Sequence, residues 1–540
     1  MKIFNKTHLP LVILVILYLV TRLHNLLLLP IFTDESIYIY WAKIIATTHS
    51  QWGISLTDGK PPLLVWMIAF FLQILPSHWY LLAGRLPSVI SGGIALWGTY
   101  KLTKLLFNSE KTALFASLIY ICSPFILFYD RMALFDSLLT AMTLWSAYFA
   151  LKTAKTHNIK DVILWGLFLG LAYLSKPTAA IFLFLTPSIY VIFKGKDILH
   201  DWKKSFLLMG IPLFMGELIN NLQRFSHVYY LMAAKNQQFQ QPWDKLLKDP
   251  FALTWSNLHG FFGWIIPYYT LPIFIIGLLS LIVILFTNRK IGLVLIILWF
   301  APIFILSTVG REIFPRYILF TTPYFLIAIA YFIVSLYEKA SLLNNQRVAR
   351  ARVPKTSSTV ARDEENMDNP NFHRELYLER ILGNATDRTR VILILFSFLI
   401  LFPSLRFDYL LLTDPPSAPL PDSDYHQYIS EHPSGYGLDK IYAFLNQELK
   451  KGTVNLIVQG TFGLYPYAFY LEYWDNPNLK INPRWPLSSL EPDILVMAKS
   501  TPTYILLKEY DKIPDNLPLK LVLKAEKPGG KYPILLTTLK

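Results

Sequence analysis

Acidic and basic side chains gather where long apolar runs end, and almost none lies in the middle of such a run. They form an acidic set and a basic set: Asp34, Glu35, Asp58, Asp130, Asp136 and Glu217, and Lys60, Arg85, Arg131, Lys176, Arg311 and Arg316. A carboxylate can take the proton from an attacking hydroxyl, and lysine and arginine commonly hold phosphate. Together the two sets predict a site for a lipid-phosphate-linked substrate at one water–lipid boundary.

The composition predicts a membrane protein. The 540-residue chain is 54% hydrophobic and 16% charged, whereas a soluble globular chain usually carries about 25% charge. Apolar runs such as Leu9–Val20, Ile273–Phe286 and Ile291–Leu306 belong to segments near the roughly 20 residues that a helix needs to cross a bilayer. A soluble enzyme and a disordered chain are therefore excluded. A transmembrane β-barrel is also excluded, because its strands alternate polar and apolar residues.

Charge and ligand-forming residues limit the partners and cofactors. The net charge is +14, and in a membrane protein basic residues hold cytoplasmic loops in place, so we expect membrane lipids and no nucleic acid as partners. The single cysteine, Cys122, excludes a disulfide framework and a zinc site built on several thiolates. The eleven histidines are scattered and form no HExxH motif, so we expect no metal and no cofactor.

Eleven apolar segments predict membrane-spanning helices, at about 9–29, 81–100, 112–129, 133–151, 162–175, 178–193, 205–219, 265–286, 291–309, 317–337 and 391–412. The first lacks a small-residue cleavage site, so we expect it to remain as an uncleaved span. Every second loop is rich in lysine, which places the N-terminus inside. The odd number of spans then places the C-terminus outside.

Three regions lie outside the expected spans. The first outer loop, 30–80, holds two amphipathic stretches, 35–47 and 62–75, typical of helices in the interface plane. We interpret the charged, weakly apolar segment 338–390 as a disordered cytoplasmic insert. The region 413–540 is expected to form a small extracytoplasmic α/β domain, with a helix at 439–451 and strands at 454–459, 494–498 and 504–507.

These elements predict the fold class and the domains. The fold is an all-α polytopic membrane domain of about eleven helices, followed by the small α/β domain. The expected boundaries are a catalytic membrane domain at 1–337, the insert at 338–390, the last membrane helix at 391–412 and the α/β domain at 413–540.

Several short motifs resemble the GT-C glycosyltransferases, in particular the dolichyl-phosphate-mannose protein mannosyltransferases and the bacterial aminoarabinose and lipopolysaccharide-core transferases. The motifs are Thr33-Asp34-Glu35, Asp58-Gly59-Lys60-Pro61-Pro62-Leu63, Gly84-Arg85-Leu86-Pro87-Ser88, the stretch from Tyr129-Asp130-Arg131 to Asp136, Leu174-Ser175-Lys176-Pro177-Thr178 and Pro315-Arg316-Tyr317. Each motif alone is weak, but their order at alternate loops is fairly specific. The resemblance covers 1–200 well and 200–337 loosely, and it does not reach the insert or the C-terminal domain.

The resemblance implies an inverting transferase of the outer leaflet that needs no metal. It would move a sugar from a polyprenyl-phosphate donor to an acceptor glycan, lipid or protein. Asp34 matches the family's catalytic position, and Glu35 is its neighbour in the expected catalytic pair. The remaining site residues are expected to bind the donor phosphate, namely Lys60, Arg85, Lys176 and Arg316, or to support the site, namely Asp58, Asp130, Arg131 and Asp136.

Each assignment has a purely structural alternative. Asp34 and Glu35 could form an exposed helix N-terminus, and Lys60 could be an anchor whose charged end reaches the interface. Asp130 and Arg131 could form a loop ion pair. Lys176 and Arg316 could be boundary residues.

Two other functions stay open. A transporter or flippase for lipid-linked sugars would place broken helices and polar sites at mid-membrane. A polysaccharide ligase or oligosaccharyltransferase would show a larger outer loop or a metal-binding DxD. The polar, aromatic loop 220–264 could close over donor or acceptor, but no residue in it can be singled out.

Overall fold

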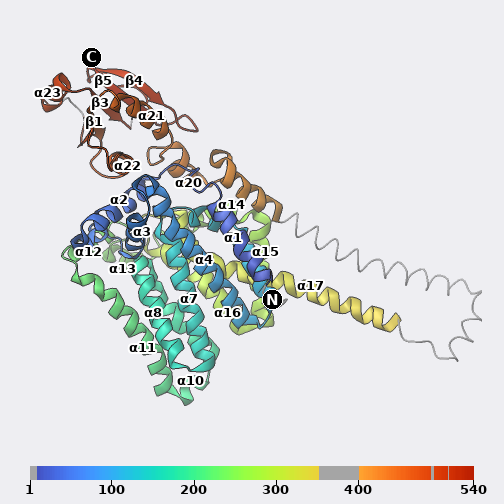
Figure 1. The fold of residues 1–540 in the computed structure, drawn as a ribbon. Helices are drawn as coiled ribbons and strands as arrows, with labels where there is room; N and C mark the ends of the chain where they lie inside the picture. The colour runs from blue at the N-terminus through green and yellow to red at the C-terminus, as the bar shows by residue number, and fades with distance from the viewer. Residues whose placement is uncertain (1–8, 352–400, 488–491, 509) are drawn as a thin grey trace, which may run out of the picture.

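Figure 1 shows a bundle of long helices and, at the C-terminus, a small domain built on a five-stranded sheet. The computed structural model describes residues 9–351, 401–487, 492–508 and 510–540. The expected fold class, an all-α membrane domain followed by a small α/β domain, is confirmed.

The helices of the bundle follow one another along the chain with short connections, except between α1 and α4 and between α11 and α14. They are α1 (Leu9–Leu23), α4 (Tyr80–Phe107), α5 (Glu110–Ile121), α6 (Pro124–Asp130), α7 (Phe135–Thr156), α8 (Ile159–Ser175), α9 (Phe182–Lys194), α11 (Trp202–Asn221), α14 (Thr254–Tyr269), α15 (Leu271–Thr287), α16 (Arg289–Val309) and α17 (Thr322–Ala351). Residues 401–413 form a further helix.

Shorter helices fill the loops between them. These are α2 (Thr33–Thr47), α3 (Leu63–Ile74), α10 (Asp197–His200), α12 (Tyr229–Asn236) and α13 (Trp243–Lys248), with the 3₁₀ turns η1 (His49–Gln51), η2 (Ile54–Asp58), η3 (Ser77–Trp79), η4 (Pro177–Ile181), η5 (Leu222–Phe225), η6 (Pro315–Thr321) and η7 (Pro415–Ser417). The two expected interfacial stretches, 35–47 and 62–75, coincide with α2 and α3.

Each expected span that falls on described residues lies on one of these helices or on a bent pair of them. By length and composition, five helices of the described residues are able to cross a membrane, or seven if each bent pair counts as one span. The pairs are α5 with α6, bent by 63°, and α14 with α15, bent by 108°. Pro124 is the first residue of α6 and Pro272 the second residue of α15. Proline is tolerated in the first turn of a helix because its missing N–H would have no partner within the helix.

The lysine-rich turns meet at one end of the bundle. Lys155 Nζ donates to the Leu105 carbonyl at 2.5 Å, and Lys290 Nζ donates to the Phe193 carbonyl at 2.8 Å. Lys155 also lies 5.7 Å from the centroid of the Phe193 ring. The turns after α4, α7, α9 and α15 are therefore neighbours, as their alternation along the sequence predicts.

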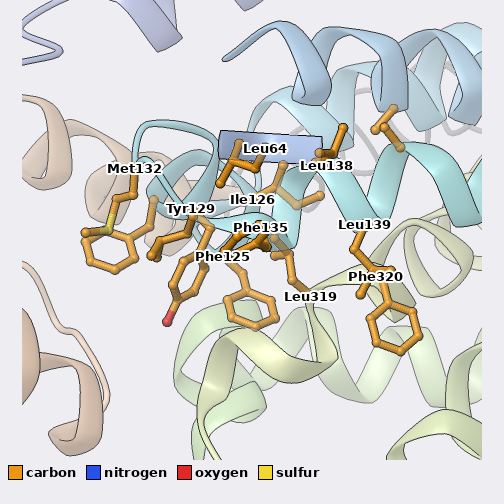
Figure 2. Close-up of a cluster of buried hydrophobic side chains, with 14 of the residues drawn as sticks. Leu64, Phe125, Ile126, Tyr129, Met132, Phe135, Leu138, Leu139, Leu319 and Phe320 are labelled. Atoms are coloured by element: carbon orange, nitrogen blue, oxygen red, sulfur yellow. The ribbon is translucent and has the colours of Figure 1, made fainter. Parts of the chain in front are cut away.

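A buried apolar cluster joins the elements that carry the site residues (Figure 2). Its members come from α3, α6, α7 and η6: Leu64, Phe125, Ile126, Tyr129, Phe135, Leu138, Leu139, Leu319 and Phe320. Lipid tails are as apolar as these side chains, so close packing contributes more to this cluster than transfer from water does. The cluster fixes the starts of α7 and η6 relative to α3.

The C-terminal sheet has the order β2-β1-β3-β5-β4. Its strands are β1 (Val454–Gln459), β2 (Leu479–Arg484), β3 (Thr503–Leu507), β4 (Leu519–Ala525) and β5 (Ile534–Leu539). β1 pairs in parallel with β2 and β3, whereas β5 is antiparallel to β3 and β4. The helices of this part are α20 (Asp422–Tyr425), the π-helical turn η8 (His426–Ser430), α21 (Leu438–Leu449), α22 (Leu464–Glu472) and α23 (Pro492–Ser500).

The sequence predictions for this domain were right at α21, β1 and β3 and wrong at 494–498. Those residues were expected to form a strand, but they lie in α23. A short apolar run does not distinguish a strand from a buried helix. Pro492 at the start of α23 and the good helix formers within it favour the helix. The strands β2, β4 and β5 were not predicted from the sequence.

The C-terminal domain packs on α2, above the bundle in Figure 1. Tyr40 of α2 stacks on Tyr467 of α22, with ring centroids 4.4 Å apart. Lys43 Nζ donates to the Tyr470 carbonyl at 2.8 Å and lies 4.1 Å from the Trp474 ring. One short interfacial helix therefore contacts both the bundle and the domain.

The connection between α17 and the last bundle helix is described in part. α17 continues beyond residue 337 to Ala351. The rest of the expected insert, 352–390, and residues 391–400 of the expected last span lie outside the described residues.

Candidate active site

Two cavities meet at the N-terminus of α2, at the end of the bundle that faces the C-terminal domain. The first, of about 120 Å³, lies between α2, the starts of α7 and η4, and the end of α16. The second, of about 410 Å³, lies between α2, η6 and the C-terminal domain. Both are lined by the same group of side chains: Asp34, Tyr38, Lys60, Phe239, Arg316 and Tyr317.

Asp34 stands at the junction of the two cavities. It lies in the first turn of α2, where the helix dipole favours a negative charge. Arg316 Nη2 donates to Asp34 Oδ2 at 2.8 Å, and the Asp34 side chain remains 24% exposed. This carboxylate is held in place while staying open to a substrate.

Arg316 is held in turn by the segment that follows the last bundle helix. Pro315 starts η6 and sets Arg316 at its beginning. Arg316 Nη1 donates to the Tyr428 hydroxyl at 2.8 Å and to Gln427 Oε1 at 3.1 Å. Tyr428 and Gln427 were not among the residues expected from the sequence, because they lie in the part of the chain that the motifs do not reach.

Lys176 enters the first cavity because a proline follows it. The residue before proline is pushed out of the helical region, and Lys176 has φ −157° and ψ 142° between α8 and η4. Its Nζ donates to Asp136 Oδ1 at 2.6 Å and lies 4.0 Å from the Tyr317 ring. Burial lowers the pKa of Lys176 to about 8, against the opposing effect of Asp136.

Lys60 reaches the same group from the loop between η2 and α3. Its Nζ lies 4.6 Å from the centroid of the Phe239 ring, and burial lowers its pKa. Gly59 has φ +72°, and a Cβ there would lie 2.7 Å from Asn236 Oδ1, so this turn requires glycine. Next to it, Lys235 Nζ lies 3.0 Å from Asp58 Oδ1, and Asp58 lines the second cavity.

The loop 220–264 covers the first cavity. Gln241 N donates to the Val309 carbonyl at 2.8 Å, and Arg311 N donates to the Phe239 carbonyl at 2.9 Å. These main-chain bonds fix Phe239 over Lys60, and Asn236 and Gln240 also line the cavity. No residue of this loop could be predicted from the sequence to line the site, since no local pattern indicates which aromatic side chain turns inward.

Glu35 and Arg85, expected at the site, line neither cavity. Arg85 Nε and Nη2 donate to Glu35 Oε1 and Oε2, each at 2.8 Å, and both side chains are buried. The amides of Phe32 and Ala133 also donate to the Glu35 carboxylate, at 3.0 and 2.8 Å. This geometry gives the pair a positioning role, because it ties the start of α2 to α4 and to the loop before α7.

Asp130 and Arg131 are likewise set apart from the cavities. Arg22 Nε lies 3.4 Å from Asp130 Oδ2, and Ser137 donates to Asp130 Oδ1 at 2.8 Å. The Arg131 guanidinium donates to carbonyls at the end of the first span, including that of His24 at 2.7 Å. These residues fasten the first helix to the α6–α7 turn.

The expected site residues therefore separate into two groups. Asp34, Asp58, Lys60, Asp136, Lys176 and Arg316 come together at the cavities, whereas Glu35, Arg85, Asp130 and Arg131 do not. Within the described parts of the chain, no group of three or more His, Cys, Asp or Glu side chains is placed to hold a metal ion.

Comparison with known proteins supports a glycosyltransferase. Residues 59–219 match the family model for dolichyl-phosphate-mannose-protein mannosyltransferase. No curated protein matches the sequence.

Two solved structures share the fold. The crystal structure of ArnT from Cupriavidus metallidurans in the apo state matches with 14% identity and a TM-score of 0.54, covering 98% of this chain and 97% of that one. The same protein bound to undecaprenyl phosphate matches with 12% identity, a TM-score of 0.55 and the same coverage. The likeness to the GT-C glycosyltransferases is thereby confirmed. The shared fold includes the C-terminal domain, which none of the sequence motifs indicated.

Proposed function

We propose that this chain transfers a sugar from a polyprenyl-phosphate donor to a hydroxyl group of an acceptor at the outer face of the membrane, with inversion at the anomeric carbon. The observation that carries the proposal is the place of Asp34. It lies at the junction of two cavities, paired with Arg316 and near further cations. The family match and the shared fold support the same conclusion.

The first cavity suits the donor. Lys60, Lys176 and Arg316 line it together with apolar side chains of α16 such as Leu306 and Val309. A cation shielded from water attracts a phosphate more strongly than an exposed one, and the apolar wall suits the first units of a prenyl chain. The undecaprenyl phosphate bound by ArnT is a ligand of this class.

The proposed step forms a bond from the acceptor oxygen to the anomeric carbon while the bond from that carbon to the phosphate oxygen breaks. Asp34 takes the hydroxyl proton. The polyprenyl phosphate leaves with the electron pair of the broken bond, and the nearby cations stabilise its charge. Arg316 orients the Asp34 carboxylate, and Glu35 with Arg85 fixes the helix that presents it.

Binding of undecaprenyl phosphate tests the donor class. We expect Lys60→Ala to raise the Kd of the purified full chain by about tenfold, since losing one shielded cation costs about 1.4 kcal/mol. Lys160→Ala is the matched control and should bind as the wild type does, because Lys160 is an exposed lysine in the first turn of α8. Equal Kd values for all three proteins, or no binding by the wild type, would contradict the proposal.

Cysteine labelling in intact cells tests the outer-face orientation. In a Cys122→Ser background, we expect Ser500→Cys on α23 to react with an impermeant maleimide. Thr156→Cys, at the lysine-rich end of the bundle, should react only after the cells are opened. Both positions are exposed. Reaction of Thr156→Cys in intact cells would place the lysine-rich turns outside and the site inside.

A further inference from the structure

We propose that Asp424 is a positioning residue for the transfer, which holds in place the side chains that fix Arg316 and thereby the orientation of the Asp34 carboxylate. The proposal rests on the function proposed above, in which Asp34 is the base. It gives a role in the reaction to the segment that joins the last bundle helix to the C-terminal domain.

Asp424 is a fully buried carboxylate held by two tyrosines of the bundle. It lies in α20. The Tyr129 hydroxyl donates to Asp424 Oδ2 at 2.5 Å, and the Tyr268 hydroxyl donates to the same oxygen. Burial raises the pKa of Asp424 to about 6, against the opposing effects of the two hydroxyls and of Arg316. The carboxylate is therefore ionised at neutral pH, and its hydrogen bonds are of the stronger, charge-assisted kind.

The two tyrosines come from the two bent helix pairs. Tyr129 lies in the last turn of α6, and Tyr268 lies in the last turn of α14. The two helices pack on each other there, since the ring of Phe125 in α6 lies 4.5 Å from that of Tyr268, measured between centroids. Asp424 therefore ties α20 to a buried, packed part of the bundle.

The same helical stretch carries the residues that fix Arg316. Gln427 and Tyr428 follow Asp424 by three and four residues, so all three lie on one side of the stretch formed by α20 and η8. The Tyr428 hydroxyl and Gln427 Oε1 accept from Arg316 Nη1 at 2.8 and 3.1 Å. Arg316 Nη2 donates to Asp34 Oδ2 at 2.8 Å. A shift of α20 would therefore move the guanidinium that orients the base.

The segment also reaches the start of α2. The Tyr428 ring packs against Phe32, the residue before α2, with centroids 4.4 Å apart. A few residues further on, the Pro433 carbonyl accepts from the Thr33 amide at 3.0 Å. Phe32 and Thr33 directly precede Asp34. One anchored segment therefore holds both the partner of the base and the backbone that carries it.

Transfer by the full chain tests the role. Asp424→Asn keeps the size of the side chain and removes its charge. With a panel of undecaprenyl-phosphate sugars as donors and membranes of the source cells as acceptor, we expect single-turnover transfer to slow by at least about tenfold, because a displacement of about 1 Å can cost about 10² in rate. The Kd for undecaprenyl phosphate should stay unchanged. Asp422→Asn is the matched control, because Asp422 is exposed on the same helix.

Hydrogen exchange tests the link without a transfer assay. In Asp424→Asn we expect the amides of Thr33 and Glu431, which donate to the Pro433 and His426 carbonyls, to exchange at least about tenfold faster, as the loss of a charged hydrogen bond predicts. Asp422→Asn should exchange as the wild type does.

An Asp34→Asn background shows whether Asp424 acts through the base. In that background we expect Asp424→Asn to cause no further loss of rate, because its effect passes through the Asp34 carboxylate. In the wild-type background Tyr428→Phe should slow transfer too, and Tyr428→Phe with Asp424→Asn should slow it by less than the product of the two single effects. A purely structural role would lower the rate by the same factor in both backgrounds.

Removal of the tyrosine hydroxyls tests the other end of the link. Tyr129→Phe together with Tyr268→Phe should slow transfer as Asp424→Asn does, because the buried carboxylate then loses both donors. Tyr324→Phe in α17 is the matched control. The Tyr324 hydroxyl is buried and has no hydrogen-bond partner among the residues that the structure describes, so its loss should leave transfer unchanged.

Two results would overturn the inference while leaving the proposed function intact. One is wild-type transfer or wild-type exchange in Asp424→Asn, and the other is an equal loss of rate in both backgrounds. Undecaprenyl phosphate binding, measured on every variant, shows that the protein is folded. An Asp34→Asn protein that transfers sugar at the wild-type rate would instead contradict the proposed function itself.

Discussion

Asp34→Asn protein is expected to bind undecaprenyl phosphate as the wild type does and to transfer sugar at least about 10² times more slowly. Asparagine has nearly the same size, and its carbonyl oxygen can still accept the hydrogen bond from Arg316 that Asp34 Oδ2 accepts at 2.8 Å. It cannot take a proton from the acceptor. Single-turnover transfer from a panel of undecaprenyl-phosphate sugars, with lipid binding measured in parallel, separates the chemical step from donor binding.

The control for this variant is Asp439→Asn, on the exposed face of α21. It makes the same chemical change away from both cavities and should transfer at the wild-type rate. Wild-type turnover by a folded Asp34→Asn protein would show that Asp34 is not the base.

Glu35→Ala is expected to lower the stability of the protein by about 3–5 kcal/mol, because it leaves the Arg85 guanidinium buried without its counter-charge. Both side chains are almost fully buried, at 0% and 1% exposure. Glu338→Ala is the matched control, since it breaks the exposed Lys111–Glu338 pair and should cost at most about 1 kcal/mol. Thermal unfolding of the purified proteins measures both changes.

A double variant distinguishes a positioning role for Glu35 from catalysis. Removing both charges in Glu35→Ala with Arg85→Leu should restore part of the lost stability, because no unpaired charge then remains. A Glu35→Ala protein as stable as the wild type but unable to transfer sugar would instead support the catalytic role that the sequence suggested.

Neighbouring residues show why the sequence could locate the site but not assign every role. Asp34 and Glu35 are adjacent, and successive residues of a helix point about 100° apart, so one faces the cavities and the other faces Arg85. Which of them faces the substrate depends on the packing of α2 against α4, and that packing cannot be predicted from the motif. Lys176 could be predicted more directly, because the proline after it fixes the local backbone.

Contacts between distant segments account for most of what the sequence did not reveal. Tyr428 bonds Arg316 across more than a hundred residues, and Phe239 meets Lys60 through the covering loop. No local sequence pattern indicates either of these two contacts. The long apolar helices were predictable because the bilayer dictates their length. The short apolar run at 494–498 fits either a strand or a helix, and the packing of the domain decided between them.

The segment 422–435 belongs structurally to the membrane half, although it follows the last bundle helix. Asp424 accepts hydrogen bonds from the Tyr129 and Tyr268 hydroxyls, and the Pro433 carbonyl accepts from the Thr33 amide at 3.0 Å. A chimaera that exchanges C-terminal domains between related proteins at the end of the last helix would remove Tyr428 and Gln427, two of the partners of Arg316. The junction that keeps these bonds lies after Gly435, whose backbone packs against Ile31; the contacts it divides are those of Lys527, whose Nζ donates to the Glu431 and Ser434 carbonyls. The modular unit that could be exchanged is therefore shorter than the part of the chain outside the bundle.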